Sequence, residues 1–114
     1  MNNYLVYFFL IIGLLFLYPD KDRLNIEETK ELILKNYILI DVRTYEEYTK
    51  ESYPNAIFFP LKTINSNSVK TKLSKNKKYI VYCRTGKRAK EAYKKLLSYG
   101  YDVKYLVGDF RKLL

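Results

Sequence analysis

The chain has 114 residues, of which 48% are hydrophobic and 29% charged, with a formal net charge of +9; this is the composition of one ordinary globular domain. It contains no His and a single Cys, which excludes Ser-His-Asp and Cys-His catalysis, an internal disulfide and most zinc sites. We therefore expect no metal and no other cofactor.

The first element is an uninterrupted apolar run over residues 4–18. Its 15 residues fall short of the roughly 20 that span a bilayer, but Tyr4 and Tyr18 flank it as aromatic residues do at membrane interfaces. We expect residues 1–18 to form an uncleaved membrane anchor, with a cleaved signal peptide or a core helix as alternatives. Residues 19–114 then form the folded domain.

The first half of this domain predicts a helix, a strand and a second helix. Asn25 is suited to cap a helix that follows it, because acidic residues occupy the first turn. The continuous apolar stretch 37–40 predicts a strand covered on both faces, as in a parallel sheet. Thr44 and Glu47 have the spacing of a capping box, which predicts a short second helix.

A turn at Pro54 and Asn55 comes next, since Asn tolerates a left-handed conformation. Residues 56–59 predict a short buried strand. A weak helix is expected between residues 62 and 73, within a polar stretch.

The clearest strand is predicted over residues 79–82, and it runs directly into Cys83. A last strand is expected at 103–107, after a helix that ends at Gly100. Strands and helices alternate, so the fold class is α/β with a mostly parallel sheet. The apolar residues that mark the face of that helix are Ala89, Ala92, Tyr93, Leu96 and Leu97.

Cys83 stands at the carboxyl end of a predicted strand, where α/β folds place their sites. The loop behind it leads into a helix whose positive N-terminus and inward-pointing amides are suited to hold an anion. A Gly in the loop permits tight curvature, and three cations add positive charge. We assign the following residues to substrate binding: Arg84, Thr85, Gly86, Lys87 and Arg88.

These features predict that Cys83 is a nucleophile, because cations and helix N-termini stabilise the reactive thiolate. The same donors would hold the negative charge that develops on attack. The alternatives are a buried small side chain for Cys83 and solvated surface charge for the three cations. Because the chain has one Cys, an adduct on it must be discharged by another molecule.

The positive charge lies in the half of the chain that contains Cys83. Residues 19–60 contain 6 basic and 9 acidic residues, a net charge of −3, whereas residues 61–114 contain 15 basic and 3 acidic residues, a net charge of +12. Such a field attracts small anions, with binding to anionic lipid or to nucleic acid as alternatives. The lysines near residues 70–78 lack interleaved aromatic residues, so we expect no nucleic-acid partner.

Four stretches, in this order, resemble single-domain rhodaneses, and the resemblance covers roughly residues 24–110. It implies a three-layer α/β/α sandwich on a central, mostly parallel sheet. It also implies a sulfurtransferase whose cysteine carries a persulfide between a donor such as thiosulfate and a thiophilic acceptor. The matching stretches are Asp41–Arg43, Tyr53–Ile57 with Pro60, Val81–Ala89, and Tyr99–Tyr101 with Leu106–Gly108.

Carried over to this chain, the resemblance makes Cys83 the persulfide carrier, with the loop amides as its cradle and the loop cations as donor-binding groups. Asp41 and Arg43 are expected to organise the site by ion pairing. Ser52 and Asn55 stand where the family often has His and Gly, and Asp109 replaces a second Gly.

The expected partners are a small anionic sulfur donor, an external thiol or protein as sulfur acceptor, and a membrane through the N-terminal segment. Small exported bacterial members of the family favour an extracytoplasmic or periplasmic location.

Two other functions compete with sulfur transfer. Phosphatases of the same fold, and by extension arsenate reductases, use a loop one residue longer, Cys-x5-Arg, whereas Cys83 to Arg88 is Cys-x4-Arg and the next position is Ala89. Ala cannot clamp a phosphate bidentately. The other alternative is a catalytically silent, anchored binding module.

Overall fold

The computed structural model describes residues 20–114. The expected N-terminal anchor over residues 1–18 lies outside them and stays a prediction, as does the location of the protein. Among residues 20–114, no helix combines the length and the apolar character needed to cross a bilayer.

A five-stranded sheet forms the centre of the structure, and every neighbouring pair of strands in it is parallel. The order β1-β5-β4-β2-β3 places β4 in the middle and the two shortest strands at the edges. Four of the five residues of β4 are buried, as expected for a strand covered on both faces. The strands are β1 Arg23–Leu24, β2 Ile38–Asp41, β3 Ile57–Phe58, β4 Lys78–Tyr82 and β5 Asp102–Leu106.

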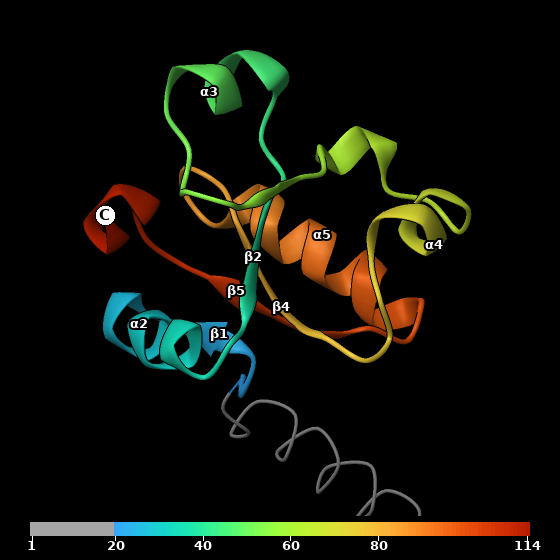
Figure 1. Ribbon diagram of the computed structural model, residues 1–114, viewed down its shortest axis with the longest axis horizontal. Helices are drawn as coiled ribbons and strands as arrows, with labels where there is room; N and C mark the ends of the chain where they lie inside the picture. The colour runs from blue at the N-terminus through green and yellow to red at the C-terminus, as the bar shows by residue number, and fades with distance from the viewer. Residues whose placement is uncertain (1–19) are drawn as a thin grey trace, which may run out of the picture.

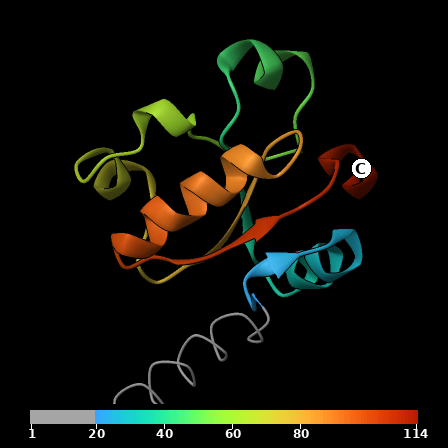
Figure 2. The same cartoon turned by 180° about the vertical axis from the view of Figure 1, so that it is seen from behind.

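Helices cover both faces of the sheet (Figures 1 and 2). One face packs against α5 (Lys87–Ser98), α4 (Ser68–Lys72) and the 3-10 helix η1 (Leu61–Thr63). The other packs against α2 (Ile26–Leu34) and the 3-10 helix η2 (Phe110–Leu113). This arrangement confirms the expected α/β/α sandwich.

A further helix, α3 (Tyr45–Lys50), lies beyond the carboxyl end of β2 (Figure 1). Thr44 and Glu47 form the predicted capping box at its start, which satisfies N–H groups that a helix end leaves free. Asn25 caps α2 in the same way, with Glu28 as its partner. The capped start of α3 fixes the position of Glu47, which matters at the site below.

The structure differs from the sequence-based prediction in two elements. The weak helix expected between residues 62 and 73 is divided into η1 and α4, because the Asn65 side chain accepts the backbone N–H of Ser68 at 2.8 Å and interrupts the helix. β1 was not predicted. Its two residues have no strand pattern, and they are held by tertiary pairing with Tyr105 and Leu106 of β5.

Candidate active site

Cys83 follows directly on β4, the central strand, and its side chain is fully buried. Its Sγ accepts hydrogen bonds from the backbone N–H of Gly86 at 3.0 Å and of Ala89 at 3.3 Å. The chain therefore curls around the sulfur, with both donors supplied by the loop and the first turn of α5. The sequence predicted a cradle made of the amides of residues 84–88; of these, the N–H of Gly86 bonds to Sγ, and the second donor is Ala89, one residue beyond the predicted range.

Gly86 makes this curvature possible. It is the N-cap of α5 and has a φ of 99°, in the left-handed region that L side chains rarely adopt. A Cβ at this position would lie 3.4 Å from the Cα of Val107 on the neighbouring segment. The loop thus needs Gly for its backbone angle, whereas the space beside Val107 would admit a Cβ in ordinary van der Waals contact.

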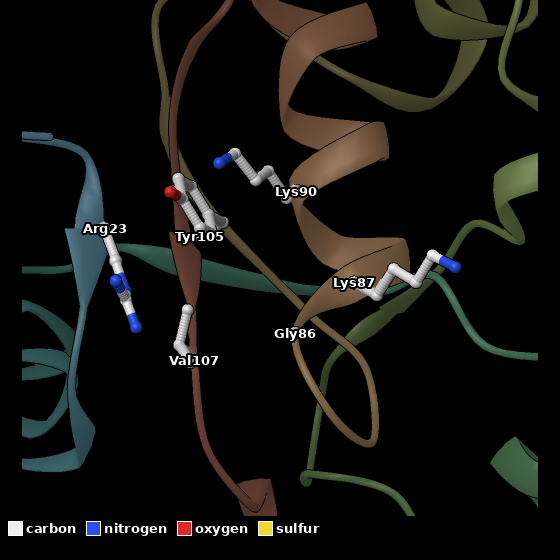
Figure 3. Close-up of a pocket in the computed structure, with 6 residues that line it drawn as sticks. All are labelled: Arg23, Gly86, Lys87, Lys90, Tyr105 and Val107. Atoms are coloured by element: carbon white, nitrogen blue, oxygen red, sulfur yellow. The ribbon is translucent and has the colours of Figure 1, made fainter. Parts of the chain in front are cut away.

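Three predicted substrate-binding residues, Arg84, Thr85 and Lys87, are exposed. A hollow of about 270 Å³ lies between Arg23 on β1 and the start of α5. Figure 3 shows the residues that line it. Lys87 contributes to the rim of this hollow, but its amino group points away from the Arg23 side chain (Figure 3). Within residues 20–114, neither Arg84 nor Lys87 forms an ion pair, so both remain able to attract an anion.

Arg88 is placed differently. Its two terminal nitrogens donate to the two carboxylate oxygens of Glu47, NH1 to Oε1 at 2.7 Å and NH2 to Oε2 at 2.9 Å. The Arg88 guanidinium therefore lowers the pKa of Glu47 to about 2, against an ordinary value of 4.5. The predicted donor-binding residue is held by a carboxylate from α3.

A second hollow, of about 150 Å³, lies at the carboxyl ends of β2 and β3. Val42, Pro60 and Leu61 give it apolar walls, and Arg88 connects it to the Cys83 loop. The hollow thus adjoins the Cys83 loop through Arg88. Its remaining lining residues are Arg43, Thr44 and Lys62.

Asp41 and Arg43 form the expected ion pair. Arg43 donates through Nε to Oδ1 of Asp41 at 3.0 Å and through NH2 to Oδ2 at 2.8 Å, and the Asp41 side chain is fully buried. Burial opposes the charge of Arg43, but the hydrogen bonds and attraction from Asp41 outweigh it and raise the pKa of Arg43. The guanidinium of Arg43 thus keeps its charge inside the protein.

Tyr82, the residue before Cys83, connects this ion pair to the nucleophile. Its hydroxyl donates to Oδ2 of Asp41 at 2.8 Å and accepts the backbone N–H of Tyr53 at 3.0 Å. Burial and the carboxylate of Asp41 raise the pKa of Tyr82 far above its usual range, so the hydroxyl stays protonated and donates. Asp41 thereby fixes the end of β4 from which Cys83 emerges.

Arg43 extends the same network to the C-terminus. Its guanidinium lies 4.5 Å from the ring centroid of Phe110 in η2 and donates to the carbonyl of Glu51. Cation–π contacts of this kind are favourable. The side chains of Tyr82 and Phe110 belong to the core on the α2 face, whereas Cys83 belongs to the core on the α5 face. Asp41 and Arg43 therefore hold the end of β4 through Tyr82 and Phe110 on the α2 face, while Arg43 also lines the hollow next to Arg88.

Sequence reasoning missed Tyr82 and the second contact of Glu47. Glu47 was identified only as a capping residue, and no local pattern indicates a partner 41 positions away in the chain. The available signal for Tyr82 was its position beside Cys83 at the end of a buried strand. Successive side chains of a strand point to opposite faces of the sheet, so Tyr82 and Cys83 face opposite ways.

The family model of the rhodanese-like domain matches residues 25–114. A rhodanese-related protein from Thermoplasma volcanium is 28% identical with a TM-score of 0.70, over 80% of this chain and 88% of that chain. The BH2092 protein from Bacillus halodurans is 31% identical with a TM-score of 0.68, over 98% of this chain and 80% of that chain. A rhodanese-like domain protein from Staphylococcus aureus is 26% identical with a TM-score of 0.70, over 82% of this chain and 91% of that chain. The search of curated proteins gave no match. Since the family model covers most of the chain and these structures share its fold, the chain belongs to the family of rhodanese-like domains.

Proposed function

We propose that this protein is a sulfurtransferase in which Cys83 carries a sulfane sulfur as a persulfide. The observation that carries the proposal is the cradle of the sulfur: Sγ accepts two backbone N–H groups inside a six-residue loop at the start of α5. Backbone donors of this kind stabilise negative charge on sulfur. They stabilise the Cys83 thiolate that attacks the donor.

The reaction has two steps. The Cys83 thiolate attacks the outer sulfur of thiosulfate, a new S–S bond forms, and the old S–S bond breaks to release sulfite with the bonding electron pair. An acceptor such as cyanide then attacks the terminal sulfur of the persulfide, giving thiocyanate and returning the thiolate. No proton needs to move, which suits a chain without His.

The exposed cations and the hollow beside the loop support a role in donor binding. Arg84 and Lys87 can attract an anionic donor, and Val42 and Leu61 give the hollow next to Arg88 apolar walls. Phosphate hydrolysis is less well supported, because Ala89 follows the six-residue loop where a longer phosphate-binding loop has its Arg.

Thiocyanate formation from thiosulfate and cyanide tests the proposal, with p-nitrophenyl phosphate hydrolysis measured in parallel. We expect the wild-type protein to form thiocyanate and Cys83→Ser to lose this activity, because a serine hydroxyl cannot accept a sulfane sulfur. After incubation with thiosulfate alone, mass spectrometry should show an adduct of about 32 Da, one sulfur atom, on Cys83.

Unfolding curves provide the control, since Cys83→Ser should unfold at nearly the same denaturant concentration as the wild type. Phosphate hydrolysis without sulfur transfer would contradict the proposal. The absence of both activities and of the adduct would point to a binding module.

A further inference from the structure

Arg88 is the cation of the Cys83 loop whose charge is already paired. Both terminal nitrogens donate to Glu47, at 2.7 and 2.9 Å. This end-on, bidentate arrangement is also the one in which Arg recognises phosphate and other oxyanions. Glu47 therefore occupies the part of Arg88 that an incoming oxyanion would use.

The carboxylate of Glu47 is held in this position by α3. Its Oε1 also accepts the backbone N–H of Thr44 at 3.2 Å and the Thr44 hydroxyl at 3.0 Å. Because these bonds belong to the capping box of α3, Glu47 cannot turn away from Arg88 without loss of the cap. The ion pair is consequently a fixed feature of the folded chain, although both side chains retain contact with solvent.

Arg88 lies where an anion at the nucleophile would meet it. It follows the loop directly, lines the hollow of about 150 Å³ and interacts electrostatically with Cys83, which contributes to the raised pKa of Arg88 after the larger effect of Glu47. Arg43 is the other guanidinium that lines this hollow, and it is held by Asp41. Without Glu47, Arg88 would therefore be the guanidinium free to bind an oxyanion there as a bidentate donor.

We propose that Glu47 is a specificity-determining residue that acts as a built-in competitor for oxyanions at the Cys83 loop. It keeps Arg88 from clamping multiply charged oxyanions such as phosphate, sulfate and the sulfonate end of thiosulfate. These anions then bind through the loop amides and the unpaired cations Arg84 and Lys87 alone. The part of this inference that concerns the sulfur donor rests on the proposed sulfur transfer. The part that concerns phosphate binding does not.

Glu47 therefore selects sulfur donors by the charge that they carry. A donor that needs a guanidinium clamp binds weakly, and phosphate does not block the loop. A donor that offers a sulfane sulfur to Cys83 with less charge on the rest of the molecule loses nothing, because it does not compete with Glu47.

The experiment measures phosphate binding by NMR, following the backbone N–H signals of Gly86 and Ala89 in the full chain as inorganic phosphate is added. Glu47→Gln removes the charge but leaves an amide oxygen to accept the Thr44 bonds. We expect this variant to bind phosphate about fivefold more tightly, since releasing an ion pair worth up to about 1 kcal/mol corresponds to that factor. The KM for thiosulfate should fall by a similar factor with little change in kcat.

Glu46→Gln is the matched control, because it removes the same charge from an exposed neighbour that has no ion pair within the described part of the chain. It should leave phosphate affinity within about twofold of wild type, because long-range effects of an exposed charge are screened. In the double variant Glu47→Gln with Arg88→Gln, the gain should disappear, which assigns it to Arg88.

Two results would overturn the inference: unchanged phosphate affinity in Glu47→Gln, or a gain that persists when Arg88 is replaced. If Glu47→Gln alone does not fold, the double variant provides a second test: it replaces a neutral ion pair by a neutral pair of Gln side chains, so its phosphate affinity should stay close to that of the wild type. The NMR measurement needs no turnover, so it separates failure of this inference from failure of the proposed sulfur transfer.

Discussion

The hydroxyl of Tyr82 makes two hydrogen bonds in the core, one to the carboxylate of Asp41 and one from the backbone N–H of Tyr53. Hydrogen bonds to a charged group contribute more than neutral ones, and a buried group that loses its partner retains the cost of desolvation. This single oxygen therefore stabilises the buried ion pair and the segment before β3 at the same time.

Tyr82→Phe should lower the free energy of unfolding by about 2 kcal/mol, because it leaves the Asp41 carboxylate and the Tyr53 amide each with one partner fewer. Tyr79→Phe is the matched comparison. The Tyr79 hydroxyl is bonded only to the backbone N–H of Ser74, at 2.8 Å in the part of the chain described, and its loss should cost about 1 kcal/mol. Urea denaturation measures both, and equal losses would argue against a special role for the Asp41 contact.

The residues of the site fall into two groups: those that contact neighbours in the sequence and those that contact residues far away in the sequence. The geometry of the loop from Cys83 to Arg88 could be predicted because it depends on adjacent backbone and on position at a strand end. The contacts Tyr82–Asp41 and Arg88–Glu47 each join residues 41 positions apart, and nothing in the local sequence specifies them. They are determined by the pairing of β2 with β4 and by the position of α3.

At the scale of elements, α5 is flanked at both ends by a glycine with a left-handed backbone angle. Gly86 has a φ of 99° and Gly100 a φ of 87°. A Cβ costs roughly 1–2 kcal/mol in this conformation. The two positions impose the same kind of strain, but only Gly86 belongs to the cradle of Cys83.

Gly86→Ala and Gly100→Ala should both reduce the free energy of unfolding, each by about 1–2 kcal/mol. Only Gly86→Ala should also impair sulfur transfer, because strain at this backbone angle would displace the N–H that bonds Sγ. At Gly100 the Cβ meets the amino group of Lys75, a flexible end that can move. Unfolding curves and initial rates of thiocyanate formation check both effects, and equal losses of activity would contradict the assignment.

The helices and strands were largely predictable where the pattern of apolar residues was regular or continuous. The apolar spacing from Ala89 to Leu97 gave α5 with both ends within two residues, and the buried run 79–82 gave β4 within one. β1 was missed because two residues carry no periodicity, and the interruption by Asn65 was missed because its side chain competes with helical bonds only once the loop is folded.

At the scale of the whole molecule, the uneven distribution of charge should have a measurable effect on the attraction of an anionic donor. The half of the chain from residue 61 onward has a net charge of +12, and it includes the Cys83 loop. Charges farther away than the Debye length act on a donor only at low ionic strength. Nearby and distant lysines should therefore differ in their dependence on salt.

Lys87→Gln and Lys78→Gln remove the same charge from opposite ends of this region. Lys78 begins β4, and five residues of strand place it roughly 16 Å from the loop. At an ionic strength of about 0.01 M both variants should lower kcat/KM for thiosulfate, whereas near 0.15 M only Lys87→Gln should do so. Initial rates across a salt series measure this, and an effect of Lys78→Gln at high salt would show that its role is not long-range attraction.

The central position of β4 has a consequence for how the protein opens. β4 is paired along both sides, with β2 and β5, whereas β1 and β3 are short edge strands. Proteins exchange amide hydrogens through partial openings that begin where structure is least supported. The edges should exchange first and β4 last, so the strand that carries Cys83 belongs to the slowest-exchanging unit of the domain. A nucleophile attached there keeps its geometry while the periphery of the molecule fluctuates.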